Sequence, residues 1–233
     1  MTSSESDHSI RLNKYIAAHT GIARRQADDL IANGQVTING KPAAIGNRYQ
    51  PGDKIYVKDS LVEQRPAATT IMLHKPAGYV CSRKQQGDSP TIYTLLPPQL
   101  RSLKPVGRLD RDSSGLLLLT DDGDLAHKLT HPKFHKQKSY IVKLDGALQP
   151  LHRQMISDFG VNLEDGISQL SLERLKEGDD YQWRVLMHEG RNRQIRRTFA
   201  ALGYQVIKLH RNRFGDYSLG DIKPGKYISV DIS

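Results

Sequence analysis

The chain has 233 residues, with 34 Lys and Arg against 25 Asp and Glu, which gives a formal net charge of +9. This charge favours a polyanionic partner, first of all RNA or DNA, over a basic protein without such a partner. A single cysteine, Cys81, excludes an intrachain disulfide, and we interpret it as a core thiol. No apolar run approaches the roughly 18 residues that span a bilayer, so we expect a cytoplasmic protein without a membrane segment.

The first module is predicted over residues 9–58, after a polar tail at residues 1–8 that we expect to be disordered. Apolar residues at helical spacing predict one helix that ends at Gly21 and a second that ends at Gly34. Short strands at 36–38 and 55–57 follow, with a turn at Asn39-Gly40. About 50 residues form a minimal core.

Basic residues mark the expected surface of this module. A solvated charged face would explain them, but arginines that open a helix are well suited to bind phosphate. The candidate RNA-binding residues are Arg11, Lys14, Arg24, Arg25 and Lys41.

A polar segment over residues 59–70 is predicted as a linker, followed by a second domain over residues 71–233. Most of its segments read as strands, with few helices between them, which favours an α+β fold with a mainly antiparallel mixed sheet. The predicted strands are 71–74, 79–82, 116–120, 140–144, 170–175, 181–187, 204–209 and 227–230, and the predicted helices are 91–96, 124–130, 150–159 and 193–202.

The segment from Gly107 to Gly115 places two arginines and two aspartates directly before a run of four leucines that reads as a buried strand. A carboxylate on a tight loop beside arginines can act as a nucleophile or base. Asp110, Asp112 and Asp121 also match positions of a calcium-binding loop. The flanking helices and the terminal Glu of such a loop are absent, so we expect no metal.

Other chemistries find little support in the sequence. His127, His131 and His135 are spaced by four residues, but Pro132 interrupts the helix that would align them. Neither a serine-hydrolase motif nor a phosphate-cradling glycine loop is present. We therefore expect no cofactor.

A second cluster places four arginines in the seven residues from Arg191 to Arg197. Like charges at this density repel unless an anion or buried carboxylates compensate them. Ile195 and the apolar residues that follow it at helical spacing should face the core, whereas Arg193, Arg196 and Arg197 should share another face. The cluster is either a solvated basic helix or the start of a helix directed at RNA phosphate, with one arginine turned inward to pair with Asp110.

Three separated motifs together resemble the pseudouridine synthases, specifically the rRNA-modifying RsuA/RluB/RluE/RluF branch with a small S4-like N-terminal RNA-binding domain. The motifs lie at 12–27, at His74-Lys75-Pro76-Ala77-Gly78-Tyr79 and at Gly107-Arg108-Leu109-Asp110. The resemblance extends over nearly the whole chain. It departs from the family at His74, where an Asn is common.

The resemblance implies a role for each matched residue. Asp110 would be the essential carboxylate, Tyr140 would stack on the uracil, and Arg196 would pair with Asp110. Substrate-binding roles would fall to Arg108, Ile195, Arg193, Arg197 and Lys75. The reaction is an isomerisation without redox change or energy input, which agrees with the expected lack of a cofactor.

The implied function is the conversion of a specific uridine in ribosomal RNA, free or in a pre-ribosomal particle, to pseudouridine by a bacterial monomer. Features at 189–197 and 215–217 favour the large-subunit rRNA, whereas the run 78–82 favours the small subunit. The alternative is a non-catalytic RNA-binding or ribosome-associated protein of the same fold, which would leave the matched Asp110, Tyr140 and Arg196 unexplained.

Overall fold

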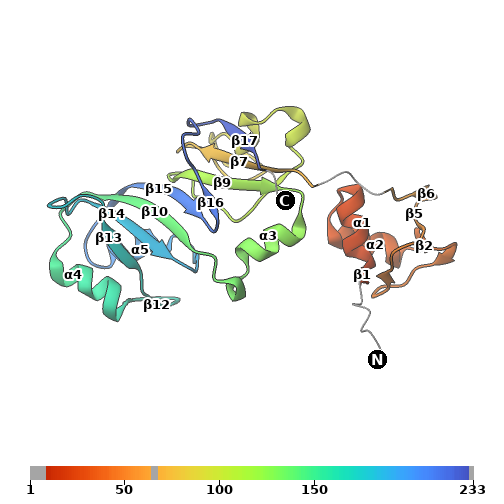
Figure 1. The fold of residues 1–233 in the computed structure, drawn as a ribbon, viewed down its shortest axis with the longest axis horizontal. Coiled ribbons are helices and arrows are strands. Elements are labelled where there is room, and N and C mark those ends of the chain that lie inside the picture. Colours follow the sequence, from red (N-terminus) through yellow and green to blue (C-terminus); the bar gives the residue numbers. More distant parts are fainter. Residues whose placement is uncertain (1–8, 64–67, 231–233) are drawn as a thin grey trace, which may run out of the picture. The chain divides into compact units, whose positions relative to one another are not determined.

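The computed structural model describes residues 9–63 and 68–230, and Figure 1 traces them. The predicted disordered tail at 1–8, part of the predicted linker (64–67) and the end of the predicted second domain (231–233) lie outside the described residues. The chain divides into two compact units, with the main boundary between Ala68 and Thr69. Each unit is described by itself.

The first unit holds the two predicted helices, α1 (Leu12–Thr20) and α2 (Arg24–Ala32). Gly21 ends α1 with φ +79°, a left-handed conformation that glycine adopts without strain. The helices pack through Leu12, Ile16 and Ala27, all almost fully buried. The strands of this unit are β1 (Ile10–Arg11), β2 (Val36–Ile38), β3 (Lys41–Pro42), β4 (Arg48–Tyr49), β5 (Ile55–Val57) and β6 (Ser60–Leu61).

The segment predicted as a linker differs from the structure at both ends. Ser60–Leu61 forms β6, which pairs with β5, and Val62 is buried in the core of the first unit. Thr70 already belongs to a strand of the second unit. The ends of the ordered elements cannot be recognised from the polar composition of 59–70. One buried valine and two strand pairings are enough to order residues 60–62.

The second unit is built on a mixed sheet with the strand order β13-β14-β10-β15-β9-β7-β17. Neighbouring strands on this path pair antiparallel, except that β15 and β9 are parallel. The α+β prediction with a mainly antiparallel mixed sheet is thereby confirmed. The strands are β7 (Thr70–Lys75), β8 (Lys104–Pro105), β9 (Ser114–Thr120), β10 (Lys138–Leu144), β11 (Val161–Leu163), β12 (Gly166–Ser168), β13 (Ser171–Arg174), β14 (Gln182–Met187), β15 (Val206–Phe214), β16 (Tyr217–Ser218) and β17 (Tyr227–Ser229).

Helices of this unit are short. They comprise α3 (Gly123–Thr130), α4 (Pro150–Gln154), α5 (Gln194–Ala200), a π-helical turn (Met155–Phe159) and 3₁₀ turns at Ile92–Leu95, Pro98–Leu100 and Pro132–Phe134. The predicted helix over 150–159 is thus an α turn that runs into a π turn. The predicted strand at 79–82 is wrong: Val80 makes a single bridge to Thr91. The hairpin β11–β12 was not predicted.

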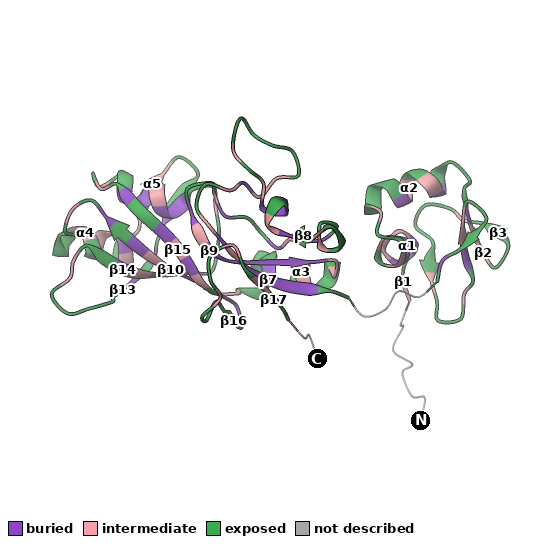
Figure 2. Ribbon diagram, turned by 90° about the horizontal axis from the view of Figure 1, so that it is seen from above, coloured by how far each residue is buried: buried purple, intermediate pink, exposed green. Residues whose placement is uncertain are grey.

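Strand β9 lies at the centre of the hydrophobic core. Its four leucines are all fully buried, with Leu117 and Leu119 in one apolar cluster and Leu116 and Leu118 in another. Figure 2 shows β9 and β7 as the most continuously buried strands. Because both faces are covered, the run is apolar throughout and does not alternate. This strand therefore holds the loop that precedes it in a fixed position.

Gly115 allows the parallel junction between β9 and β15. Its φ is +112°, and a Cβ atom built on it would lie 2.2 Å from the carbonyl oxygen of Arg211. A side chain would overlap that backbone, so only glycine permits this approach. No helix among the described residues is long and apolar enough to cross a membrane.

Candidate active site

A cavity of about 310 Å³ opens where the loop before β9 meets strand β10 and the start of α5. Predicted residues from three distant segments line it together: Arg108 and Asp110 from the loop, Tyr140 from β10, and Arg193 and Ile195 from the α5 region. The fold thus brings these five predicted residues to one cavity, whereas the predicted residues Lys75, Arg196 and Arg197 do not line it.

Lys75 holds the backbone of the Asp110 loop in place. The Lys75 ammonium donates hydrogen bonds to the carbonyl oxygens of Asp110 (3.0 Å), Ser113 (2.7 Å) and Pro76 (3.0 Å). The Ser113 amide also donates to the Asp110 carbonyl at 3.1 Å. These bonds hold the Asp110 backbone while its carboxylate faces the cavity.

Lys75 was predicted to bind substrate, and the structure places it elsewhere. Its side chain is fully buried and absent from the lining of the cavity, because the loop carbonyls surround it. Burial lowers the pKa of Lys75 to about 8, against the opposing effect of nearby negative groups. Lys75 is therefore a positioning residue for the Asp110 loop.

The expected pair between Arg196 and Asp110 is also corrected. Arg196 donates to the Asp112 carbonyl at 3.1 Å and lies 3.2 Å from the Asp112 carboxylate. The guanidinium nearest to the Asp110 carboxylate is that of Arg193, at 3.5 Å. Arg196 also donates to the Val206 carbonyl at 2.7 Å, so its fork is directed at the end of the loop and the start of β15.

Asp112 thus receives two arginines. Arg193 binds both of its carboxylate oxygens at 3.2 Å, and Arg196 lies 3.2 Å from one of them. Burial alone would raise the pKa of Asp112, but the hydrogen bonds and charges of these two arginines hold it below its ordinary value. Burial lowers the pKa of Arg196. Asp112 therefore compensates the charge of the α5 arginines and supports the loop.

The other two arginines of the cluster bind a different carboxylate. Arg197 binds both oxygens of Asp165, at 3.0 and 2.7 Å, and Arg191 binds one of them at 3.0 Å. Asp165 lies in the turn between β11 and β12. Arg197 therefore binds a different carboxylate from Arg193 and Arg196, and it does not line the cavity.

Apolar side chains form the remaining wall of the cavity. Tyr140, Met187, Ile195 and Leu209 are all at most 8 % exposed. Arg108, which also lines the cavity, is exposed. The lining therefore combines aromatic and aliphatic side chains with the Asp110 carboxylate and the arginines Arg108, Arg191 and Arg193.

Residues 69–201 match the RNA pseudouridylate synthase family, and residues 10–55 match the S4 domain. The chain belongs to the RNA pseudouridylate synthase family. It is 38% identical over 221 residues to the ribosomal small subunit pseudouridine synthase A of Haemophilus influenzae, covering 94% of each chain. It is 37% identical over 223 residues to the ribosomal large subunit pseudouridine synthase B of Bacillus subtilis, covering 92% of this chain and 89% of that protein.

A solved pseudouridylate synthase superimposes with a TM-score of 0.67 at 36% identity, covering 95% of this chain and 96% of the other. The predicted resemblance, α+β fold and enzyme class are thereby confirmed. The first unit of this pseudouridine synthase is an S4 domain. In that domain Arg11, Arg24, Arg25 and Lys41 are exposed and Lys14 is half-buried.

Several residues of this synthase that shape the site were not predicted. Gln194 is 2 % exposed, donates to Ser168 at 3.1 Å and to Glu189, and accepts from the Arg191 amide. Asp165 was missed although four clustered arginines indicated that carboxylates had to compensate them. Its position in a Glu-Asp-Gly turn was the one available signal. Among the described residues, no group of three His, Cys, Asp or Glu could hold a metal ion.

Proposed function

We propose that the protein converts a uridine of ribosomal RNA to pseudouridine, with Asp110 as the reacting carboxylate. The observation that carries this proposal is the position of Asp110. Its carboxylate lies at a cavity that also holds the Tyr140 ring and the Ile195 side chain, on a loop fixed by Lys75. The family membership of the chain and the names of its relatives support the substrate class.

The reaction breaks the bond between the ribose C1′ and N1 of uracil and forms a bond between C1′ and C5. The proton of C5 is lost and N1 gains one, so the product is an isomer of the substrate. Asp110 acts either as a nucleophile toward the nucleoside or as a base. Arg193, at 3.5 Å, keeps a positive charge beside the carboxylate throughout.

The target uridine must leave its stack, which costs a few kcal/mol. Stacking of the uracil on the Tyr140 ring returns about 1–3 kcal/mol. Ile195, Leu209 and Met187 form the apolar wall that retains the detached uracil while it turns. In our proposal Arg108, an exposed residue of the cavity lining, contacts the phosphate of the extruded nucleotide.

The experiment that tests the proposal compares Asp110→Asn with Asp112→Asn. We expect Asp110→Asn to abolish pseudouridine formation on rRNA, measured by mass spectrometry, and to leave RNA affinity nearly unchanged. Asp112→Asn should retain the reaction at a reduced rate, because its carboxylate supports the loop. An active Asp110→Asn variant would refute the role of Asp110. A wild-type protein that binds rRNA without modifying it would establish the non-catalytic alternative.

The target lies, in our proposal, in the large-subunit rRNA. The segments 189–197 and 215–217 support this choice, and the relatives include enzymes named for each subunit at similar identity. Mapping pseudouridine in both rRNAs of a deletion strain gives the answer directly. We expect one large-subunit uridine to lose its modification, and the loss of a small-subunit site would overturn the choice. The proposal includes a cytoplasmic monomer that acts on rRNA or a pre-ribosomal particle.

The S4 domain contributes RNA affinity in this proposal. Its second helix begins with Arg24 and Arg25, and no side chain caps its first turn. Free backbone N–H groups and two exposed guanidinium groups together attract phosphate. Arg11, Lys14 and Lys41 supply further positive charge on the same domain.

A further inference from the structure

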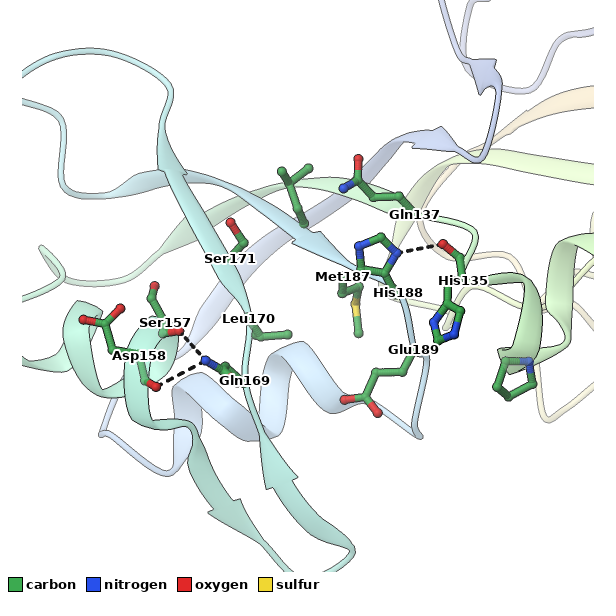
Figure 3. A pocket seen from close by; sticks show the side chains of 12 residues that line it. His135, Gln137, Ser157, Asp158, Gln169, Leu170, Ser171, Met187, His188 and Glu189 are labelled. Atoms are coloured by element: carbon green, nitrogen blue, oxygen red, sulfur yellow. Dashed lines mark hydrogen bonds between the residues drawn. The ribbon is translucent and has the colours of Figure 1, made fainter.

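A second cavity, of about 830 Å³, lies next to the catalytic one and is here termed the side cavity (Figure 3). Met187 lines both cavities, and the chain passes from Glu189 in the side cavity to Gly190 in the catalytic cavity. We infer that the side cavity binds a nucleobase adjacent to the target uridine, and that this base carries an exocyclic amino group. The inference rests on the proposed function.

Apolar groups form the inner wall of the side cavity. Leu170 is 1 % exposed and Met187 is 5 % exposed, and both belong to the main hydrophobic core of the unit. A flat heterocycle can bury one face against such a wall. Since the wall ends at Met187, a base placed there would neighbour the uracil in the catalytic cavity.

The hydrogen-bonding groups of the side cavity mainly accept. Nδ1 of His188 lies 2.8 Å from the His135 carbonyl oxygen, and a carbonyl can only accept, so Nδ1 carries the hydrogen. The other ring nitrogen of neutral His188 is then an acceptor. Gln169 donates its amide hydrogens to the carbonyls of Ser157 (2.7 Å) and Asp158 (3.2 Å), which leaves its side-chain oxygen as an acceptor (Figure 3).

The charge of the lining excludes a phosphate as the preferred ligand. Asp158 and Glu189 contribute carboxylates, and no lysine or arginine occurs among the described residues that line the cavity, although Arg191 lies 3.5 Å from one Glu189 oxygen. Acceptors and negative charge favour a ligand edge that donates hydrogen bonds. Adenine, cytosine and guanine offer an exocyclic amino group, whereas uracil has none.

The backbone at His135 is arranged to hold His188 in place. His135 has φ 45° and ψ 36°, a left-handed conformation that a non-glycine residue rarely adopts. A strained backbone conformation of this kind persists only where the surrounding contacts enforce it, and such positions are often found at functional sites. Here it directs the His135 carbonyl toward the His188 ring.

The experiment measures kcat/KM for short RNAs that contain the target uridine and each of the four bases at every flanking position. We expect the wild-type enzyme to prefer an amino-bearing base over uracil by about fivefold or more at one position, the value of a single hydrogen bond. His188→Ala and Gln169→Leu, each of which removes an acceptor from the side cavity, should abolish that preference. Both variants should leave kcat at saturating RNA within about twofold of wild type. The change in kcat/KM should therefore come from KM.

His127→Ala, an exposed histidine on α3, is the matched control and should keep the preference. Equal efficiency with all four bases at every flanking position would overturn the inference, as would a preference that survives both cavity variants. If the wild-type enzyme forms no pseudouridine at all, the proposed function fails and this inference fails with it. A variant that still forms pseudouridine but has lost its base preference is therefore distinguishable from an enzyme that has lost the reaction.

Discussion

The two units of this chain use their basic residues in different ways. In the synthase domain, Arg193 and Arg196 are held by the Asp112 carboxylate and by backbone carbonyls. In the S4 domain, Arg24 and Arg25 are exposed, and Arg24 makes one long hydrogen bond of 3.4 Å to a side chain. The same residue type is therefore held by carboxylate and carbonyl groups in one unit and is exposed in the other. Variants of each class should consequently fail in different assays.

Gly115→Ala should have the largest effect on the synthase domain. The added methyl group would overlap the Arg211 backbone at 2.2 Å, and φ +112° is strained for any side chain. Neither strand can shift without breaking the core around β9. We expect a loss of unfolding free energy of about 3 kcal/mol or more, measured by urea denaturation. Gly123→Ala, where a Cβ would meet open space, is the control and should cost little.

Arg196→Lys tests whether the two hydrogen bonds of this guanidinium hold the Asp110 loop in place. Lysine keeps the charge but cannot bond Asp112 and Val206 at the same time. We expect kcat to fall by about tenfold to a hundredfold, because a displacement of the reacting group by about 1 Å has that consequence. Single-turnover kinetics provide the measurement. Arg197→Lys, whose guanidinium binds Asp165, is the matched control, and an equal loss there would remove the distinction between the two pairs.

Lys75→Met tests the buried ammonium through the pH dependence of stability. Burial lowers the folded-state pKa of Lys75 to about 8, whereas an unfolded lysine titrates near 10.4. Between these values the unfolded state binds more protons than the folded state, so the unfolding free energy of the wild type rises with pH. Below pH 8 Lys75 is charged in both states, and burial of its charge lowers the unfolding free energy by the full amount.

The measurement is the difference in unfolding free energy between wild type and Lys75→Met at pH 7, 8, 9 and 10. Other titrating groups cancel in this difference. We expect it to shift in favour of the wild type as pH rises above about 8. A difference that stays constant over this range would show that Lys75 does not titrate there.

The double substitution Arg24→Ala/Arg25→Ala should have the smallest effect on the enzyme itself. We expect kcat and stability to be unchanged and RNA binding to be weaker. The slope of log K against log salt should fall by about 1.4 to 1.8 if both guanidinium groups contact phosphates. Filter binding at several salt concentrations provides the test. An unchanged slope would remove these arginines from the RNA footprint and weaken the contrast between the two units.

Local sequence patterns determined much of the fold. The helices of the S4 domain follow from apolar spacing and from Gly21, because helix ends depend on neighbouring residues. Strand β9 was recognisable since a short run of leucines after charged residues suits a strand covered on both faces. The irregular segment at 79–82 and the hairpin β11–β12 were not recognisable, because short apolar pieces carry no period that separates strand from loop.

The sequence by itself singled out the Asp110 loop and the α5 segment by their charged clusters, and the resemblance to pseudouridine synthases added Tyr140; all three line one cavity. Only the tertiary structure decided how their charges pair. Asp110 and Asp112 are the same residue type two positions apart, and the four arginines look interchangeable along the chain. Which guanidinium reaches which carboxylate depends on where β9, β15 and the β11–β12 hairpin place the backbone. In the folded chain Arg196 lies 3.2 Å from the Asp112 carboxylate, and Arg193 lies 3.5 Å from that of Asp110.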